Sequence, residues 1–144
     1  MALTAEQTER IRASFMELSR DLPLAGEVFY DRLFAIAPET RALFVTDMAD
    51  QGAKLMSTIS IVVSQLHMRS SLQPLLAELA IRHLAYGVCR VHYEQVGAAL
   101  DEMLSIVLAD RYGEDNREAW MTAYDEIAGT MISAAYGSFA DPPR

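Results

Sequence analysis

Apolar residues recur every three or four positions along nearly the whole chain, which is the spacing of one face of an α-helix. Prolines and glycines divide this pattern into segments, and the apolar–polar alternation of a surface β-strand is absent from the sequence. Leucine, alanine, methionine and glutamate are plentiful, and this composition also favours helices. The sequence therefore predicts an all-α fold of about seven helices joined by short loops.

Several segments carry their own start or stop signals. Thr4 and Gln7 have the spacing of a capping box, which predicts the start of the first helix. A short third helix is expected from Pro38 to near Phe44, because proline suits a first helical turn. Ser71 can cap a later helix, and Gly87 suits its end.

Length and charge limit the class of protein. A chain of 144 residues suits a single domain over residues 1–144, and its last residues, about 138–144, are expected to fray. The net charge of −8 and the lack of a basic block argue against partners such as nucleic acid or an anionic membrane surface. Cys89 is the single cysteine, which excludes an internal disulfide and is typical of a reducing, cytoplasmic setting.

One histidine stands where the helical pattern calls for another leucine. Leu72, Leu76 and Leu79 precede His83 at helical spacing, so His83 continues an apolar face. A core histidine bonded to a backbone carbonyl is one interpretation of this position. The other is an imidazole that faces a cofactor held between helices, since a neutral imidazole nitrogen is a good metal ligand.

Three stretches in this order resemble the globin family, in particular single-domain bacterial haemoglobins and the globin part of flavohaemoglobins. They are "FYDRLFAIAPETRALF" from Phe29, "LAIRHLAYGVCRVHYEQVG" from Leu79 and "AWMTAYDEIAG" from Ala119, and the resemblance runs from Thr4 to Tyr136. It implies a globin fold around haem b (iron protoporphyrin IX), with His83 as the proximal ligand of the iron.

On the other side of the haem, the resemblance assigns two aromatic residues. Phe44 looks like the phenylalanine that packs on the haem face. Tyr30 precedes it at the family's spacing and looks like the residue that faces the gaseous ligand. A phenol there would stabilise the negative charge of bound O2 through a charge-assisted hydrogen bond.

The second distal residue depends on which family spacing is used. Counting back from His83 as in the bacterial group gives Gln51, whereas the spacing of vertebrate oxygen carriers gives Lys54. With Gln51 distal, Leu55 lies one turn on, and Val63 falls inward with it; with Lys54 distal, Val63 would face outward.

Two glycines favour the bacterial spacing. The resemblance implies that the second and fourth helices cross closely, and small residues such as Gly26 and Gly52 would allow this contact. We therefore expect Gln51 and Leu55 in the distal pocket, and Lys54 at the haem rim beside a propionate.

Near His83, the match to flavohaemoglobins is incomplete. Tyr93 corresponds to the tyrosine that contacts the proximal histidine, and His92 to the histidine before it, which approaches a propionate. The family's glutamate is replaced by Ala135, and Asp125 and Glu126 are expected off the inward face. The imidazole Nδ1–H of His83 is then expected to donate a hydrogen bond to the carbonyl of Leu79, one turn back. This predicts that His83 donates less electron density to the iron than the proximal histidine of flavohaemoglobins does.

The resemblance implies reversible binding and transport of O2, with NO and CO as further ligands. NO dioxygenation would need a separate reductase, so activity as an enzyme stays open. A haem-based gas or redox sensor is the alternative, followed by a globin-fold scaffold without haem. The sequence leaves the choice between monomer and homodimer open.

Overall fold

The computed structural model describes residues 3–45 and 47–136, and within these ranges the chain is helical with no strand. The α-helices are α1 (Ala5–Leu18), α2 (Leu22–Ile36), α3 (Met48–Ser64), α4 (Arg69–Ala85), α5 (Arg90–Leu108) and α6 (Glu114–Tyr136). Three short 3-10 helices, η1 (Ser19–Asp21), η2 (Pro38–Leu43) and η3 (Ala109–Arg111), complete them.

The predicted all-α fold is confirmed, and the expected short third helix is the 3-10 helix η2. The predicted capping box is also present, because Thr4 Oγ1 accepts from the Gln7 N–H and Gln7 Oε1 accepts from the Thr4 N–H, both at 3.0 Å. The chain end expected to fray lies outside the described residues. Among the described helices, none has the length and apolar character needed to cross a membrane.

The start of α4 differs from the prediction. Ser71 was expected to cap this helix, but α4 begins at Arg69, with Met68 as its N-cap residue. The Met68 carbonyl accepts hydrogen bonds from the N–H groups of Ser71 and Leu72, both at 3.1 Å. These backbone bonds extend the helix without a side-chain cap, which the residue types do not reveal.

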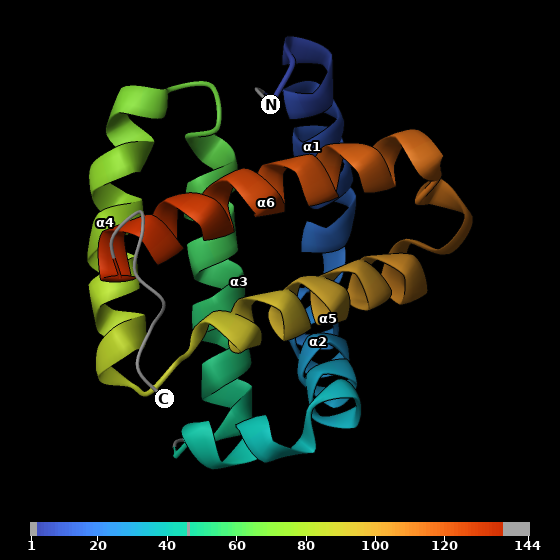
Figure 1. Ribbon diagram of the computed structural model, residues 1–144. Helices are drawn as coiled ribbons and strands as arrows, with labels where there is room; N and C mark the ends of the chain where they lie inside the picture. Colours follow the sequence, from blue (N-terminus) through green and yellow to red (C-terminus); the bar gives the residue numbers. More distant parts are fainter. Residues whose placement is uncertain (1–2, 46, 137–144) are drawn as a thin grey trace.

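The helices pack around one core, in which α2 contacts α3 and α5, and α6 contacts α1 and α4. Figure 1 shows α5 and α6 running across the direction of α3 and α4. A buried hydrogen bond of 2.8 Å from Trp120 Nε1 to Ser14 Oγ ties α6 to α1. The largest fully buried side chains are Ile11, Leu18, Leu33, Met56, Met103, Leu104 and Leu108.

The α2–α3 crossing is as close as the glycine pair predicts. A Cβ added to Gly26 would lie 3.1 Å from the Cα of Gly52 and 3.3 Å from its carbonyl oxygen. A Cβ added to Gly52 would lie 3.5 Å from the Cα of Gly26, which is ordinary van der Waals contact. The crossing therefore tolerates a side chain at Gly52 of α3 better than at Gly26 of α2.

We predict that Gly26→Ala and Gly52→Ala have opposite effects on the free energy of unfolding. In Gly26→Ala the new methyl group meets backbone atoms, which should destabilise the fold by about 1–3 kcal/mol. In Gly52→Ala the helix propensity gained, about 1 kcal/mol, should leave stability equal or higher. Urea unfolding of both variants checks this, with Gly129→Ala as a control because nothing lies within 4 Å of a Cβ there. Equal destabilisation by the two exchanges would contradict the described asymmetry.

Candidate functional site

Tyr30 stands at the centre of an aromatic cluster on α2 and the segment after it. Its side chain is buried, with 6% of its surface exposed. Its ring centroid lies 4.9 Å from that of Phe29, 5.8 Å from that of Phe34 and 5.1 Å from that of Phe44. The contacts with Phe29 and Phe44 are edge-to-face, a favoured arrangement of aromatic pairs. The cluster thus fixes the plane and direction of the Tyr30 ring.

The Tyr30 hydroxyl is a neutral donor at ordinary pH. Burial raises the pKa of Tyr30 from 10.0 to about 12, and a hydrogen bond with the side chain of Gln51 offsets part of the rise. Gln51 comes from α3, so the two predicted distal residues meet across the glycine crossing. Only a few residues connect Phe44 to the start of α3 at Met48, and Gln51 still reaches Tyr30 from the first turn of this helix.

The register of α3 separates the two predicted distal candidates. Lys54 is exposed, whereas Gln51 and Leu55 are half-buried. Val63 is buried, as the interpretation with Gln51 inward requires and the one with Lys54 inward does not. The geometry therefore brings Gln51 to the side of Tyr30, packs Leu55 against the core and leaves Lys54 at the surface.

His83 lies near the end of α4 and is half-buried. Its Nδ1 is 2.7 Å from the carbonyl oxygen of Leu79, the hydrogen bond predicted from the sequence. Because a carbonyl only accepts, Nδ1 carries the proton and Nε2 keeps its lone pair. The helix backbone thus orients the imidazole and leaves one basic nitrogen for a ligand.

The end of α4 fixes the backbone of His83 as well. Gly87 has a φ of +92°, the left-handed conformation that glycine adopts most easily, as its predicted place at the helix end suggests. The Val88 N–H donates to the His83 carbonyl at 3.0 Å, and the Gly87 N–H donates to the Leu84 carbonyl at 3.1 Å. A Cβ at Gly87 would lie 3.7 Å from the side chain of Leu43, so the end of α4 lies beside η2, just before Phe44.

Tyr93 adjoins His83 from α5, as predicted. Tyr93 is buried, and its ring centroid lies 6.5 Å from that of His83, with the planes 28° apart. Its backbone carbonyl accepts a 2.6 Å hydrogen bond from the Tyr124 hydroxyl of α6. Tyr124 reaches this position because Gly97 leaves room for its ring; a Cβ there would lie 2.9 Å from a ring carbon. Sequence reasoning missed this link, although a buried glycine inside a helix is a signal of close packing.

His92 caps a helix, in addition to the contact with a haem propionate that the resemblance implies. Its Nδ1 accepts a 2.8 Å hydrogen bond from the Cys89 N–H and so caps the start of α5. Because Nδ1 accepts, the proton of neutral His92 is on Nε2, which remains available as a donor. Cys89 is half-buried, with its Sγ 3.7 Å from the Gly87 carbonyl.

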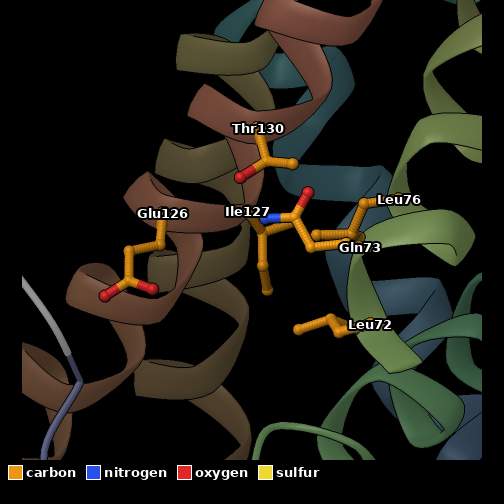
Figure 2. Close-up of a pocket in the computed structure, with 6 residues that line it drawn as sticks. All are labelled: Leu72, Gln73, Leu76, Glu126, Ile127 and Thr130. Carbon is orange, nitrogen blue, oxygen red and sulfur yellow. The ribbon is translucent and has the colours of Figure 1, made fainter. Parts of the chain in front are cut away.

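The expectation that Glu126 lies off the inward face stays a prediction, and the structure places this residue beside the first turns of α4. Glu126 is half-buried, one of its carboxylate oxygens is inaccessible, and it borders a cavity of about 30 Å³ between α4 and α6. Leu72, Leu76 and Ile127 form the apolar part of this cavity, while Figure 2 shows the Glu126 carboxylate directed away from them. The packing of α6 on the first turns of α4, which periodicity does not specify, places Glu126 at the edge of this cavity. Asp125 is exposed, as expected.

This cavity is separate from the site around His83. Leu76 is the lining residue of α4 nearest to His83 in sequence, and seven residues of helix, about 10 Å, separate them. The cavity also has room only for a molecule the size of water, so it does not compete with the His83 site for a large cofactor.

Half-buried apolar side chains occur on the elements that carry Tyr30, Gln51, His83 and Tyr93, and in the segments that adjoin them. These side chains pack on the core but keep part of their surface exposed, which a flat apolar group could cover. Together with the Nε2 lone pair of His83, these side chains supply the nitrogen donor and the apolar contacts that a haem requires. They are Phe34, Phe44, Leu55, Ile59, Val62, Leu79, Val88 and Val96.

Comparison with known proteins identifies the family to which the fold belongs. The family model named Globin matches residues 27–131. A neuroglobin of Dissostichus mawsoni is 29% identical over 143 residues, and the match covers 90% of each chain. A flavohemoprotein of Chromobacterium violaceum is 28% identical over 143 residues, covering 96% of this chain but 35% of that relative.

Two solved structures have the same fold. One is an engineered carbene transferase made from a candidate nitric oxide dioxygenase of Rhodothermus marinus; its TM-score is 0.83, it is 28% identical, and the match covers 93% of this chain and 94% of that one. The other is a hexacoordinated haem protein from an anhydrobiotic tardigrade, with a TM-score of 0.84 and 18% identity, covering 92% of this chain and 95% of that one. At 18% identity, the second likeness concerns the fold alone.

We predict that Tyr30 makes stability depend on pH only in alkaline solution. Because its pKa is higher in the folded chain than its ordinary value of 10.0, its contribution is complete below pH 10 and is lost as pH rises toward 12. At pH 11 the loss should be about 1.4 kcal/mol. Urea unfolding at pH 8 and pH 11 checks this against Tyr30→Phe, which cannot ionise there. Equal pH dependence of the two proteins would show that Tyr30 is not desolvated.

Proposed function

The chain belongs to the globin family, and from this premise we propose that it binds haem b through His83 and receives O2 beside Tyr30 and Gln51. Membership of the family implies haem-based binding of small gaseous ligands. The haem, when bound, supplies an iron atom that takes a protein nitrogen on one face and a gaseous ligand on the other. The remaining chemistry belongs to the side chains around it.

On the proximal side we assign the iron ligand to Nε2 of His83. The proposal is supported by the bond of Nδ1 to the Leu79 carbonyl, which holds the ring and its tautomer. A carbonyl partner pulls the Nδ1 proton less than a carboxylate would, so His83 donates less electron density than a histidine paired with glutamate. Tyr93 packs beside the imidazole and limits its rotation.

On the distal side we assign the hydrogen-bond donor to the Tyr30 hydroxyl. The single observation that carries this role is the buried, neutral phenol in its aromatic cluster, bonded to Gln51. The hydrogen bond with Gln51 lowers the pKa of Tyr30, which indicates that the Gln51 amide donates to the phenol oxygen, so the phenol O–H can donate to a ligand with negative charge. Leu55 and Phe44 exclude water around the ligand, which strengthens such a bond.

At the rim of the site we assign Lys54 and His92 to the haem propionates. Lys54 is exposed and its flexible side chain can extend along the rim. His92 offers Nε2–H, because Nδ1 already accepts from Cys89. Both groups supply donors for a carboxylate without entering the apolar interior.

NO dioxygenation is the enzymatic extension of this proposal. In that reaction NO, O2 and one electron give nitrate, and a separate reductase would supply the electron. Support comes from the similarity to the candidate nitric oxide dioxygenase of Rhodothermus marinus and to the flavohemoprotein. NO and CO are expected to compete with O2 for the same distal position.

We predict that Tyr30→Phe releases O2 about ten- to a hundredfold faster than the unmodified protein, because it loses one charge-assisted hydrogen bond. Stopped-flow displacement of O2 by CO measures this rate. Tyr112→Phe is the matched control, since Tyr112 is also buried and loses a hydroxyl bonded to Asp101. Unchanged O2 release in Tyr30→Phe would contradict the distal role, and so would an equal change in Tyr112→Phe.

A further inference from the structure

Arg41 lies just outside the aromatic cluster, on η2, and contacts two of its members. Its guanidinium carbon is 5.5 Å from the ring centroid of Phe34, and its Nη1 donates a 3.2 Å hydrogen bond to the Phe44 carbonyl. Among the described residues, Arg41 is paired with no carboxylate. Its charged group is thus directed at an aromatic face and a backbone carbonyl.

We propose that Arg41 is a positioning residue that clamps Phe34 and Phe44 around Tyr30 and so sets how firmly the distal donor is held. This inference rests on the distal role proposed for Tyr30. It adds a residue that touches neither the gaseous ligand nor Tyr30 itself.

Each of the residues Tyr30, Phe34, Phe44 and Arg41 contacts at least two of the others. Phe34 and Phe44 meet edge-to-face at 5.8 Å, and each also contacts the ring of Tyr30. Arg41 then joins Phe34 to Phe44 from outside. A displacement of either phenylalanine therefore changes the packing of the Tyr30 ring.

Phe44 depends on this clamp because little else holds its backbone. It directly follows η2, and its N–H donates to the Arg41 carbonyl at 3.2 Å, so both of its backbone groups bond to the same residue. The next residue, Val45, has 93% of its surface exposed, so its side chain does not hold the backbone of Phe44 in place. Loss of the Arg41 side chain removes one of the two backbone ties and the contact with Phe34.

The chemistry of the contact requires arginine. A planar guanidinium can lie over a ring and donate an in-plane hydrogen bond at the same time. A lysine ammonium keeps the charge but cannot make both contacts with this geometry. Near neutral pH, Arg41→Lys therefore separates the clamp from the charge alone, whereas in the alkaline titration below the lysine is largely neutral and both variants lack the charge.

The first test uses the protein without haem, so it does not depend on the proposed function. The alkaline titration of Tyr30 is obtained as the difference in phenolate absorbance between each variant and the same variant carrying Tyr30→Phe. We expect the midpoint in Arg41→Ala and Arg41→Lys to fall by about half a unit or more, because a looser cluster admits water to the phenol. Loss of the positive charge alone would raise the midpoint, so the sign of the shift distinguishes the two causes. Arg12→Ala, which removes an exposed arginine paired with Glu9 on α1, should not shift it.

The second test measures O2 release from the haem-loaded protein. Both Arg41 variants should release O2 about three- to tenfold faster, less than Tyr30→Phe, because the donor is loosened rather than removed. A Tyr30 midpoint that stays or rises in both variants would overturn the clamp, whatever the outcome with haem. A lowered midpoint with O2 release within twofold of the unmodified protein would equally overturn its action on the ligand. Failure of the proposed function would instead appear as an unchanged rate in Tyr30→Phe.

Discussion

The close crossing of α2 and α3 at Gly26 and Gly52 is the constraint on which the distal side depends. Without side chains at these two positions, the helix backbones approach to ordinary atomic contact. Tyr30 lies one turn after Gly26, and Gln51 directly precedes Gly52, so the same contact brings their side chains together. A wider crossing would separate the phenol from the amide and admit water between them. The crossing thus matters for the contact between Tyr30 and Gln51 as well as for the fold, and Gly26 is the glycine whose replacement it tolerates least.

The proximal side depends on backbone groups rather than on a charged partner. Two carbonyls take part: that of Leu79 orients the His83 ring, and that of His83 itself accepts from Val88 at the helix end. A third hydrogen bond, from the Tyr124 hydroxyl to the Tyr93 carbonyl, connects α6 to the first turn of α5. Within the described residues, the hydrogen-bond partner of the imidazole is a backbone carbonyl and not a carboxylate. If His83 holds the iron as we propose, such a site would favour reversible ligand binding over chemistry that needs strong electron donation to the iron.

Sequence reasoning identified contacts that the resemblance or helical periodicity marks. The resemblance predicted the close crossing at Gly26 and Gly52, and helical position favoured Gln51 over Lys54 as the inward residue. Contacts between helices that no such signal marks were not identified. Glu126 borders a cavity beside α4, and Tyr124 reaches α5 only because Gly97 lacks a side chain. Neither follows from a pattern within one segment, because each requires the placement of a second helix.

The visible absorption spectrum with added haemin tests the central claim most directly, with His83→Ala measured beside the unmodified protein. The account predicts a sharp Soret band for the unmodified protein, which shifts on reduction with dithionite and shifts again in O2. His83→Ala should lose the haem or bind it loosely, whereas His67→Ala, which changes an exposed histidine, should keep the full spectrum. The spectrum of free haemin in the unmodified protein, or an unchanged spectrum in His83→Ala, would contradict the account.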